Sequence, residues 1–190
     1  MSRWEPDARG RLERAAFALY AERGFDHTTV AEIAERAGLT ERTFFRHFAD
    51  KREVLFAGAR DLRELLVGAV ADAPASLAPL DAVAAGLEAA GGRAFHQGRR
   101  EGARQRQAII AAHAELQERE LIKLAALSAA LADALRGRGV GEPDASLAAE
   151  AGIAVFRVAF DRWIADANQQ GFPQLVRASL DRLKAVIGGA

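Results

Sequence analysis

The sequence contains no cysteine among its 190 residues, and it has few aromatic residues and no excess of charge of either sign. The absence of cysteine excludes disulfide bonds, thiolate metal sites and a cysteine nucleophile. The formal net charge is zero, so bulk electrostatics do not make the whole chain a binder of polyanions. Any affinity for nucleic acid therefore has to come from a local basic patch.

Long apolar runs are also missing. The first residues, Met1 to Pro6, do not lead into the apolar segment of a signal peptide, and no later stretch is long and apolar enough to span a membrane. We therefore expect a soluble, cytoplasmic protein with no membrane partner. Half of the residues are apolar, which suffices for one substantial core, or for a small module joined to a larger domain.

Motifs for catalysis or for metal binding are equally scarce. The chain has no phosphate-binding loop, no dinucleotide fingerprint and no nucleophile elbow. None of its four histidines lies four residues from another metal-ligand residue in a zinc-type motif; they are His27, His47, His96 and His113. We therefore predict a protein that is not an enzyme and that needs neither a metal ion nor a cofactor.

What the sequence does contain is a pattern of two short helices joined by a tight turn, at residues 28–51. The first helix has an apolar face with the spacing i, i+3, i+4, i+7, which begins at Val30 and ends at Ala37. Thr29 is suited to cap its start, and Gly38 is suited to end it. Thr40 then caps the second helix, in which Phe44 and Phe48 share one face and should pack inward.

The opposite face of the second helix carries Arg42, Thr43 and Arg46, with Phe45 and His47 on its flanks and Lys51 just beyond. Arginine can bind guanine or phosphate with two hydrogen bonds, threonine can contact a base through its hydroxyl or methyl group, and lysine can hold a phosphate. This face is therefore suited to the major groove of DNA. The alternative is a solvated charged face on an ordinary helical hairpin.

Residues 9–56 resemble the N-terminal domain of the TetR (tetracycline repressor) family of transcriptional regulators. The stretches that carry the resemblance are AAFALYAERGF (15–25), TTVAEIAERAG (28–38) and LTERTFFRHFADKREVLF (39–56). The resemblance implies an all-helical homodimer that binds a palindromic operator and is released by a small ligand. By position it also implies the DNA-facing residues Thr29, Thr40, Arg42, Thr43, Phe45, Arg46, His47 and Lys51. Position 45 is commonly tyrosine in that family, and Phe45 lacks the hydroxyl for a phosphate bond, which leaves packing on a thymine methyl or a sugar.

The remainder of the chain keeps helical periodicity, so the predicted fold class is all-α. We predict a helix-turn-helix DNA-binding domain at 1–52 and a helical ligand-binding and dimerisation domain at 53–190. One helix should run from Lys51 through Val70, and the helix from about residue 144 to 168 is apolar on more than one side. Together with the amphipathic last helix, it is suited to a four-helix bundle across a two-fold axis. The alternative is a monomer with an ordinary core.

Polar residues on otherwise apolar helices indicate a ligand site. Gln107 precedes His113, and Arg157 lies between Phe156, Phe160 and Trp163. Aromatic walls with a few orienting polar groups are typical of a small-molecule pocket. Alternatively, Arg157 pairs with Asp161, either internally or at the dimer seam, and His113 is a hydrogen-bonded core histidine.

The body also resembles an actinobacterial-type subgroup of the family that includes a mycofactocin-associated regulator with an acyl-CoA effector. The phrase ELQERELIKL (115–124) carries this resemblance, which implies a hydrophobic or acyl-CoA-like effector. The leading hypothesis is a homodimeric repressor of transcription that its effector releases from DNA. The alternatives are an activator, an effector-independent DNA-binding dimer of the same fold, and a helical lipid-binding protein or enzyme.

Overall fold

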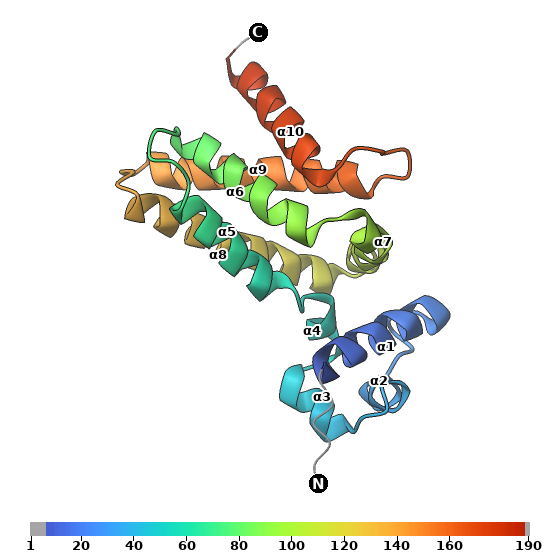
Figure 1. Cartoon of the computed structure of the whole chain (residues 1–190). Coiled ribbons are helices and arrows are strands. Elements are labelled where there is room, and N and C mark those ends of the chain that lie inside the picture. The colour runs from blue at the N-terminus through green and yellow to red at the C-terminus, as the bar shows by residue number, and fades with distance from the viewer. Residues whose placement is uncertain (1–6, 189–190) are drawn as a thin grey trace. The chain divides into compact units, whose positions relative to one another are not determined.

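The computed structural model describes residues 7–188, and all statements below concern that part of the chain. The protein divides into two compact units, residues 1–58 and residues 59–190, whereas the sequence predicted a boundary after residue 52. The described part is all-α, without a strand, as predicted. Its helices are α1 (Ala8–Arg23), α2 (Val30–Arg36), α3 (Glu41–His47), α4 (Lys51–Leu55), α5 (Ala59–Ala71), α6 (Pro79–Ala94), α7 (Gln97–Ala112), α8 (Ala114–Gly137), α9 (Asp144–Ile164) and α10 (Phe172–Ile187) (Figure 1).

In the N-terminal unit, α1 packs against α2, α3 and α4. One apolar stripe of α1 is buried, and it comprises Leu12, Ala16, Leu19 and Tyr20. Asp7 caps the start of α1 by accepting a hydrogen bond from the Gly10 amide, and Gly24 ends the helix at a φ of 83°. Because such a φ is unfavourable for a residue with a Cβ, glycine is the residue suited to this stop.

The predicted turn between the two short helices is confirmed. Gly38 has a φ of 65°, and the Leu39 amide donates to the Ala34 carbonyl over 2.8 Å, a bond that satisfies the last turn of α2. A Cβ at position 38 would lie 2.8 Å from the Arg11 Nη2 atom. Glycine is therefore suited to this position both by its backbone conformation and by its lack of a side chain.

The prediction of a single helix from Lys51 to Val70 is wrong. The chain forms α4 and α5 instead, with a turn at residues 56–58. At this turn the Phe56 amide donates to the Glu53 carbonyl, three residues back, and the Arg9 guanidinium donates to the Ala57 carbonyl. Gly58, which follows, has low helix propensity. The helical hydrogen-bond ladder is interrupted where the Phe56 and Ala57 amides bond three residues back, and the Arg9 contact at the same turn is one that periodicity along the chain cannot reveal.

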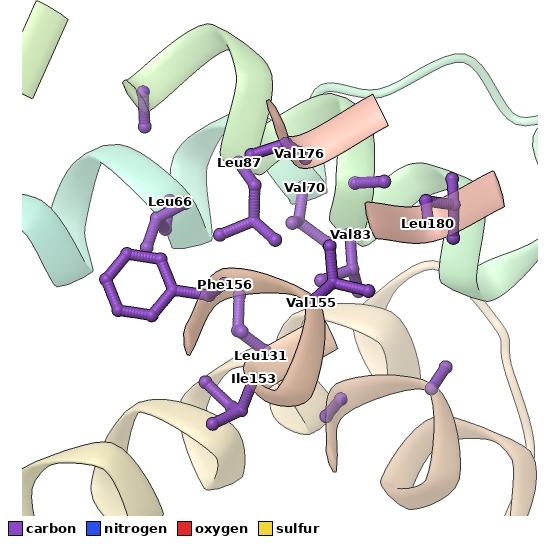
Figure 2. Close-up of a cluster of buried hydrophobic side chains, with 14 of the residues drawn as sticks. Leu66, Val70, Val83, Leu87, Leu131, Ile153, Val155, Phe156, Val176 and Leu180 are labelled. Atoms are coloured by element: carbon purple, nitrogen blue, oxygen red, sulfur yellow. The ribbon is translucent and has the colours of Figure 1, made fainter. Parts of the chain in front are cut away.

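In the C-terminal unit, α5, α6, α8, α9 and α10 surround one hydrophobic core. Figure 2 shows side chains from all five helices meeting in it, for example Leu66 from α5, Val83 from α6, Leu131 from α8, Val155 from α9 and Val176 from α10. Burying apolar side chains at about 25 cal/mol per Å² is the main favourable contribution to such a fold. No helix within residues 7–188 has the length and apolarity needed to cross a membrane.

The sequence predicts that the helix at 144–168 is apolar on more than one side, and in the structure two of these sides differ in exposure. The side with Ile153, Phe156 and Trp163 is buried in the core. On the other side, Val155 is buried but Leu147, Ala154 and Val158 are exposed. The helix itself is shorter than predicted, since α9 ends at Ile164. One apolar stripe of α9 is thus left uncovered within the single chain.

Candidate nucleic-acid interface and ligand site

Helix α3 is held in place by its inner face and by its cap. Thr40 Oγ1 accepts a hydrogen bond from the Thr43 amide over 3.2 Å and so satisfies an otherwise unpaired donor of the first turn. Phe44 is fully buried, and its ring centroid lies 5.5 Å from that of the buried Phe48. The two rings therefore fix which face of α3 remains outside.

The outer face of α3 presents the residues that the sequence predicted. Arg42, Phe45, Arg46 and His47 are exposed, and Thr43 is half-buried. Within residues 7–188, neither Arg42 nor Arg46 has a hydrogen-bond or ion-pair partner. Phe45 is 55 % exposed, and its ring meets that of Phe44 edge to face. These side chains are available to a ligand outside the unit.

Other arginines of the same unit are paired. Arg23 contacts Glu32 at 2.6 Å, Arg36 contacts Glu22 at 2.5 Å and Arg52 contacts Asp50 at 2.8 Å. The positive charge of these guanidinium groups is therefore largely balanced locally, whereas that of Arg42 and Arg46 is not. Exposed, unbalanced charge on one helix face is the electrostatic pattern expected of a nucleic-acid contact.

Thr29 has a structural task at the start of α2. Its Oγ1 accepts from the Glu32 amide over 3.3 Å, and the Glu32 carboxylate accepts from the Thr29 amide over 2.9 Å. This reciprocal pair is a capping box, and the bond from the Thr29 amide is the largest of the causes that lower the pKa of Glu32. Thr29 remains exposed, as does Thr40, whose hydroxyl lies 3.1 Å from that of Thr43.

Lys51 lies differently from the prediction that it holds a phosphate. Its ammonium group donates to the carbonyls of Phe25, Asp26 and Thr28 over 2.8, 3.1 and 2.9 Å, and it lies 4.6 Å from the centre of the Phe25 ring. An ammonium group has three N–H donors, so all of them are used inside the unit. Lys51 thereby ties the start of α4 to the turn between α1 and α2.

A second bond supports the same junction. The Tyr20 hydroxyl donates to the Lys51 carbonyl over 2.8 Å, and burial, followed by the charge of Asp50, raises the pKa of Tyr20.

Desolvation, followed by the charges of Arg46 and Arg9, lowers the pKa of the exposed His47. His47 therefore favours its neutral form at neutral pH and adds a hydrogen-bonding group to the face rather than a further charge.

In the C-terminal unit, three of the predicted ligand residues meet in an aromatic cluster. We define it as Phe95, Phe156, Phe160, Trp163 and Phe172. Phe95 follows the end of α6, Phe172 begins α10, and the other three lie on α9. Sequence reasoning missed Phe95 and Phe172, because each stands alone at a helix end and belongs to no periodic pattern.

The other three predicted ligand residues, Gln107, His113 and Arg157, are not members of this cluster. The Gln107 side chain approaches Glu120 on α8 at 3.4 Å, beside an Arg106–Glu120 ion pair of 3.0 Å. His113 Nδ1 donates to the Ile109 carbonyl over 2.7 Å. Arg157 is exposed, and within residues 7–188 it forms no pair with Asp161, which is also exposed. Gln107 and His113 thus have structural contacts between and within helices. The single chain does not contain an internal Arg157–Asp161 pair, and a pair of these residues at the dimer seam stays a prediction.

A separate shallow groove lies between α5 and α8. It is lined by Arg60, Arg63, Glu64 and Val67 of α5 and by Ala130, Asp133 and Ala134 of α8. No predicted ligand residue lines it, and its charges are mixed in sign. Across the described residues, no group of three or more histidine, aspartate and glutamate side chains is arranged to hold a metal ion.

Comparison with known families matches most of the chain. Residues 13–57 match bacterial regulatory proteins of the tetR family, and residues 77–188 match the MftR C-terminal domain. The first match covers α2, α3 and α4 with most of α1, and the second begins just before α6 and extends to the end of the described part. The two resemblances noted in the sequence, for the N-terminal domain and for the body, are therefore confirmed.

Individual relatives and solved structures agree with these matches. The chain is 40 % identical over 85 residues, or 45 % of its length, to the transcriptional regulator TcmR of Streptomyces glaucescens. It is 45 % identical over 47 residues, or 25 % of its length, to the transcriptional repressor KstR2 of Mycobacterium tuberculosis. These stretches span only 38 % and 24 % of those relatives. The crystal structure of SmeT with triclosan matches 94 % of this chain and 90 % of that chain with a TM-score of 0.66 and 21 % identity, which shows a shared fold.

Proposed function

Because this chain belongs to the TetR family of bacterial regulatory proteins, we propose that it is a homodimeric, cytoplasmic repressor of transcription that a small molecule releases from a palindromic operator. The N-terminal unit is the DNA-binding part and the C-terminal unit binds the effector and the second copy of the chain. The similarity to the repressor KstR2 supports repression rather than activation.

The observation that carries the proposal is the outer face of α3. Arg42 and Arg46 are exposed and have no partner among the described residues, while nearby arginines of α1, α2 and α4 are paired. Two unpaired charged side chains on one short helix indicate that their partner lies outside the chain. DNA supplies both phosphates and guanine acceptor atoms.

In the proposed complex α3 lies in the major groove. Arg42 and Arg46 contact bases or phosphates, the hydroxyls of Thr40 and Thr43 contact phosphate or base edges, and Phe45 packs on a thymine methyl or a sugar. Thr29 and His47 contact the backbone at the edges of the groove. Lys51 acts by holding the turn between α1 and α2, and thereby the start of α2, rather than by a phosphate bond.

The second copy of the chain would dock on α9 and α10. Leu147 and Val158 on α9 and Val186 and Ile187 on α10 are exposed, and apolar surface of this kind is expected to be covered in an oligomer. A two-fold axis would place the two recognition helices about 34–36 Å apart along the duplex, or a multiple of that spacing. Such a dimer requires an operator with inverted half-sites.

The effector we propose is hydrophobic or acyl-CoA-like, in keeping with the match of residues 77–188 to the MftR C-terminal domain. Its site includes Phe156, Phe160 and Trp163. A ligand can shift the protein off DNA only if it binds the non-operator conformation more tightly than the operator-bound one. Of the alternatives, an effector-independent dimer lacks this last step, and an activator differs in the sign of regulation.

The test is a titration of the protein against DNA fragments, including the DNA beside its own gene, at two salt concentrations. Tight binding to one fragment that weakens steeply with added salt is expected, because phosphate contacts release counterions. Uniformly weak binding to every fragment at both salt concentrations would contradict a sequence-specific repressor.

A further inference from the structure

The five rings of the aromatic cluster come from three separate elements and are closely packed. The Phe95 ring centroid lies 4.5 Å from that of Phe172 and 5.5 Å from that of Trp163, and the Trp163 and Phe172 centroids are 6.2 Å apart. Most of these pairs are edge-to-face or tilted, the geometries that aromatic rings prefer. The rings thus form one continuous apolar cluster at the place where the ends of α6 and α9 meet the start of α10.

Trp163 contains a polar group that the fold leaves unused. Its side chain is 0 % exposed, and its Nε1 atom finds no hydrogen-bond acceptor among the described residues. The indole N–H is a donor only, and buried donors are nearly always paired. The surrounding rings provide at most a weak N–H···π contact. The arrangement therefore lacks one acceptor atom next to Trp163.

The chemistry around this donor restricts what can supply that acceptor. None of the five side chains in the cluster carries a charge, so a charged group entering it would lose its hydration without compensation. Phe95 and Phe160 are only partly buried, and the cluster reaches the surface at these two rings. An uncharged aromatic compound that carries one acceptor oxygen would stack on the rings and pair with Nε1.

Helix α7 is fastened over the loop between α9 and α10. It begins two residues after Phe95, at Gln97. Arg100 donates to the carbonyls of Asn168, over 2.7 Å, and Ala165, and Arg104 pairs with Asp166. The Asn168 side chain in turn donates to the Trp163 carbonyl over 3.3 Å. The segment that joins Trp163 to Phe172 is therefore held by the arginines of α7.

We propose that the aromatic cluster binds an uncharged aromatic effector whose carbonyl oxygen accepts a hydrogen bond from Trp163 Nε1, and that α7 is the lid over this site. Release of the Arg100 contacts lets Phe95 and α7 move and admits the ligand. The inference rests on the proposed function, which requires an effector. Of the hydrophobic and acyl-CoA-like effectors named there it selects an uncharged aromatic one, and it adds the atom that recognises it.

The test compares two ligands of the same shape, 2-acetylnaphthalene and 2-ethylnaphthalene, of which only the first has an acceptor oxygen. The protein is the full chain with Trp4→Phe, so that Trp163 gives the single indole N–H signal in a ¹⁵N–¹H NMR spectrum. We expect 2-acetylnaphthalene to shift this signal downfield and to bind roughly fivefold to tenfold more tightly, the effect of one hydrogen bond. Equal binding with an unmoved signal, or no binding of either compound, would overturn the proposal.

Three further variants distinguish the role of the indole donor from that of ring packing, and the role of the proposed lid from that of surface charge. Trp163→Phe keeps a ring but removes the N–H, and it should make the affinities for the two compounds equal. Arg100→Ala should accelerate both association and dissociation of 2-acetylnaphthalene. Arg99→Ala, which removes an exposed neighbouring arginine of α7, should leave both rates unchanged, and equal effects of the two arginine variants would contradict the lid.

Operator binding, measured separately, distinguishes failure of this inference from failure of the proposed function. A protein that binds one DNA fragment tightly, and that a saturated acyl-CoA releases without any change in the Trp163 signal, would overturn the aromatic effector alone. A protein that binds no DNA but shows the expected difference between the two naphthalenes would support the site and overturn the repressor.

Discussion

The guanidinium group of Arg42 extends from the first turn of α3 without a partner in the described part of the chain. If it binds a guanine with two hydrogen bonds, Arg42→Ala should weaken operator binding by about 1–3 kcal/mol. Binding to unrelated DNA should change much less, and fluorescence anisotropy on both DNAs measures the difference. Arg99→Ala, at another exposed arginine, is the matched control and should bind both DNAs like the wild type.

An equal loss on operator and unrelated DNA would instead make Arg42 a phosphate contact.

Sequence reasoning could predict which α3 residues face outward, because Phe44 and Phe48 define the inner face by their spacing and both are buried. Which outward arginine contacts a base depends on the position of the helix in the groove, and that is a property of the complex.

Lys51 is the residue whose predicted contact differs most from its position in the structure. Lys51→Met keeps the apolar part of the side chain but removes three hydrogen bonds to the carbonyls of residues 25, 26 and 28. Charged hydrogen bonds contribute more than neutral ones, so we expect the free energy of unfolding of the N-terminal unit to fall by about 1–3 kcal/mol. Urea denaturation followed by circular dichroism measures it.

The control for Lys51→Met is Arg42→Ala, which removes an exposed charge from the same unit and should change stability by no more than about 0.5 kcal/mol. Unchanged stability of Lys51→Met, together with a salt dependence of DNA binding reduced by about one phosphate contact, would restore the phosphate role. The sequence could not predict the observed contact, because the three carbonyls belong to a turn whose geometry follows from the packing of Tyr20 and Phe25.

Helix α6 contains two adjacent glycines, Gly91 and Gly92, with opposite surroundings. A Cβ at position 91 would lie 2.3 Å from Cδ1 of the fully buried Phe172, whereas a Cβ at position 92 would meet only Pro173 Cγ at 3.9 Å. We expect Gly91→Ala to destabilise the C-terminal unit by about 1–3 kcal/mol through overpacking. Gly92→Ala should stabilise it by up to about 1 kcal/mol through helix propensity.

Thermal unfolding of the two glycine variants beside the wild type measures both changes, and each variant is the control for the other. Stabilisation by both substitutions would mean that Phe172 moves aside easily and that the close approach of α6 and α10 is not required. The two glycine variants also probe the contact of α6 with the aromatic cluster, since the Phe172 ring that a Cβ at position 91 would meet is the ring nearest Phe95.

Most helix ends followed from local chemistry that the sequence displays. Gly38 follows α2 as predicted, Gly24 ends α1 in the same way, and Pro143 precedes α9. The turn between α4 and α5 did not follow, and it coincides with a tertiary contact, from Arg9 to the Ala57 carbonyl 48 residues away. The aromatic cluster was predicted only in part for the same reason: three of its rings share α9, but Phe95 and Phe172 join them through tertiary packing.

At the scale of the whole protein, the apolar stripe of α9 is not covered by any packing within the single chain. Periodicity could show that α9 is apolar on more than one side, but only the packing of α6, α8 and α10 decides which side remains outside. That side contains Leu147, Ala154 and Val158. Exposed apolar side chains at these spacings along one helix favour association with a second copy through the same surface.

Val158→Asp tests this proposed dimer. Val158 is 52 % exposed, so an aspartate is tolerated in the isolated chain, but in a two-fold interface each substitution would place a charge in an apolar contact near its symmetry mate. We expect a dimer for the wild type and a monomer for Val158→Asp by light scattering. Operator affinity should fall at the same time, because each DNA-binding unit would then bind a half-site alone.

Leu121→Asp is the matched control, since Leu121 is 57 % exposed but lies on α8 rather than on α9 or α10. It should remain dimeric and should bind the operator like the wild type, and circular dichroism should show equal helix content in both variants. Loss of the dimer in Leu121→Asp with retention in Val158→Asp would move the interface from α9 to α8. A wild-type protein that is monomeric at concentrations at which it binds the operator tightly would remove the two-fold arrangement altogether.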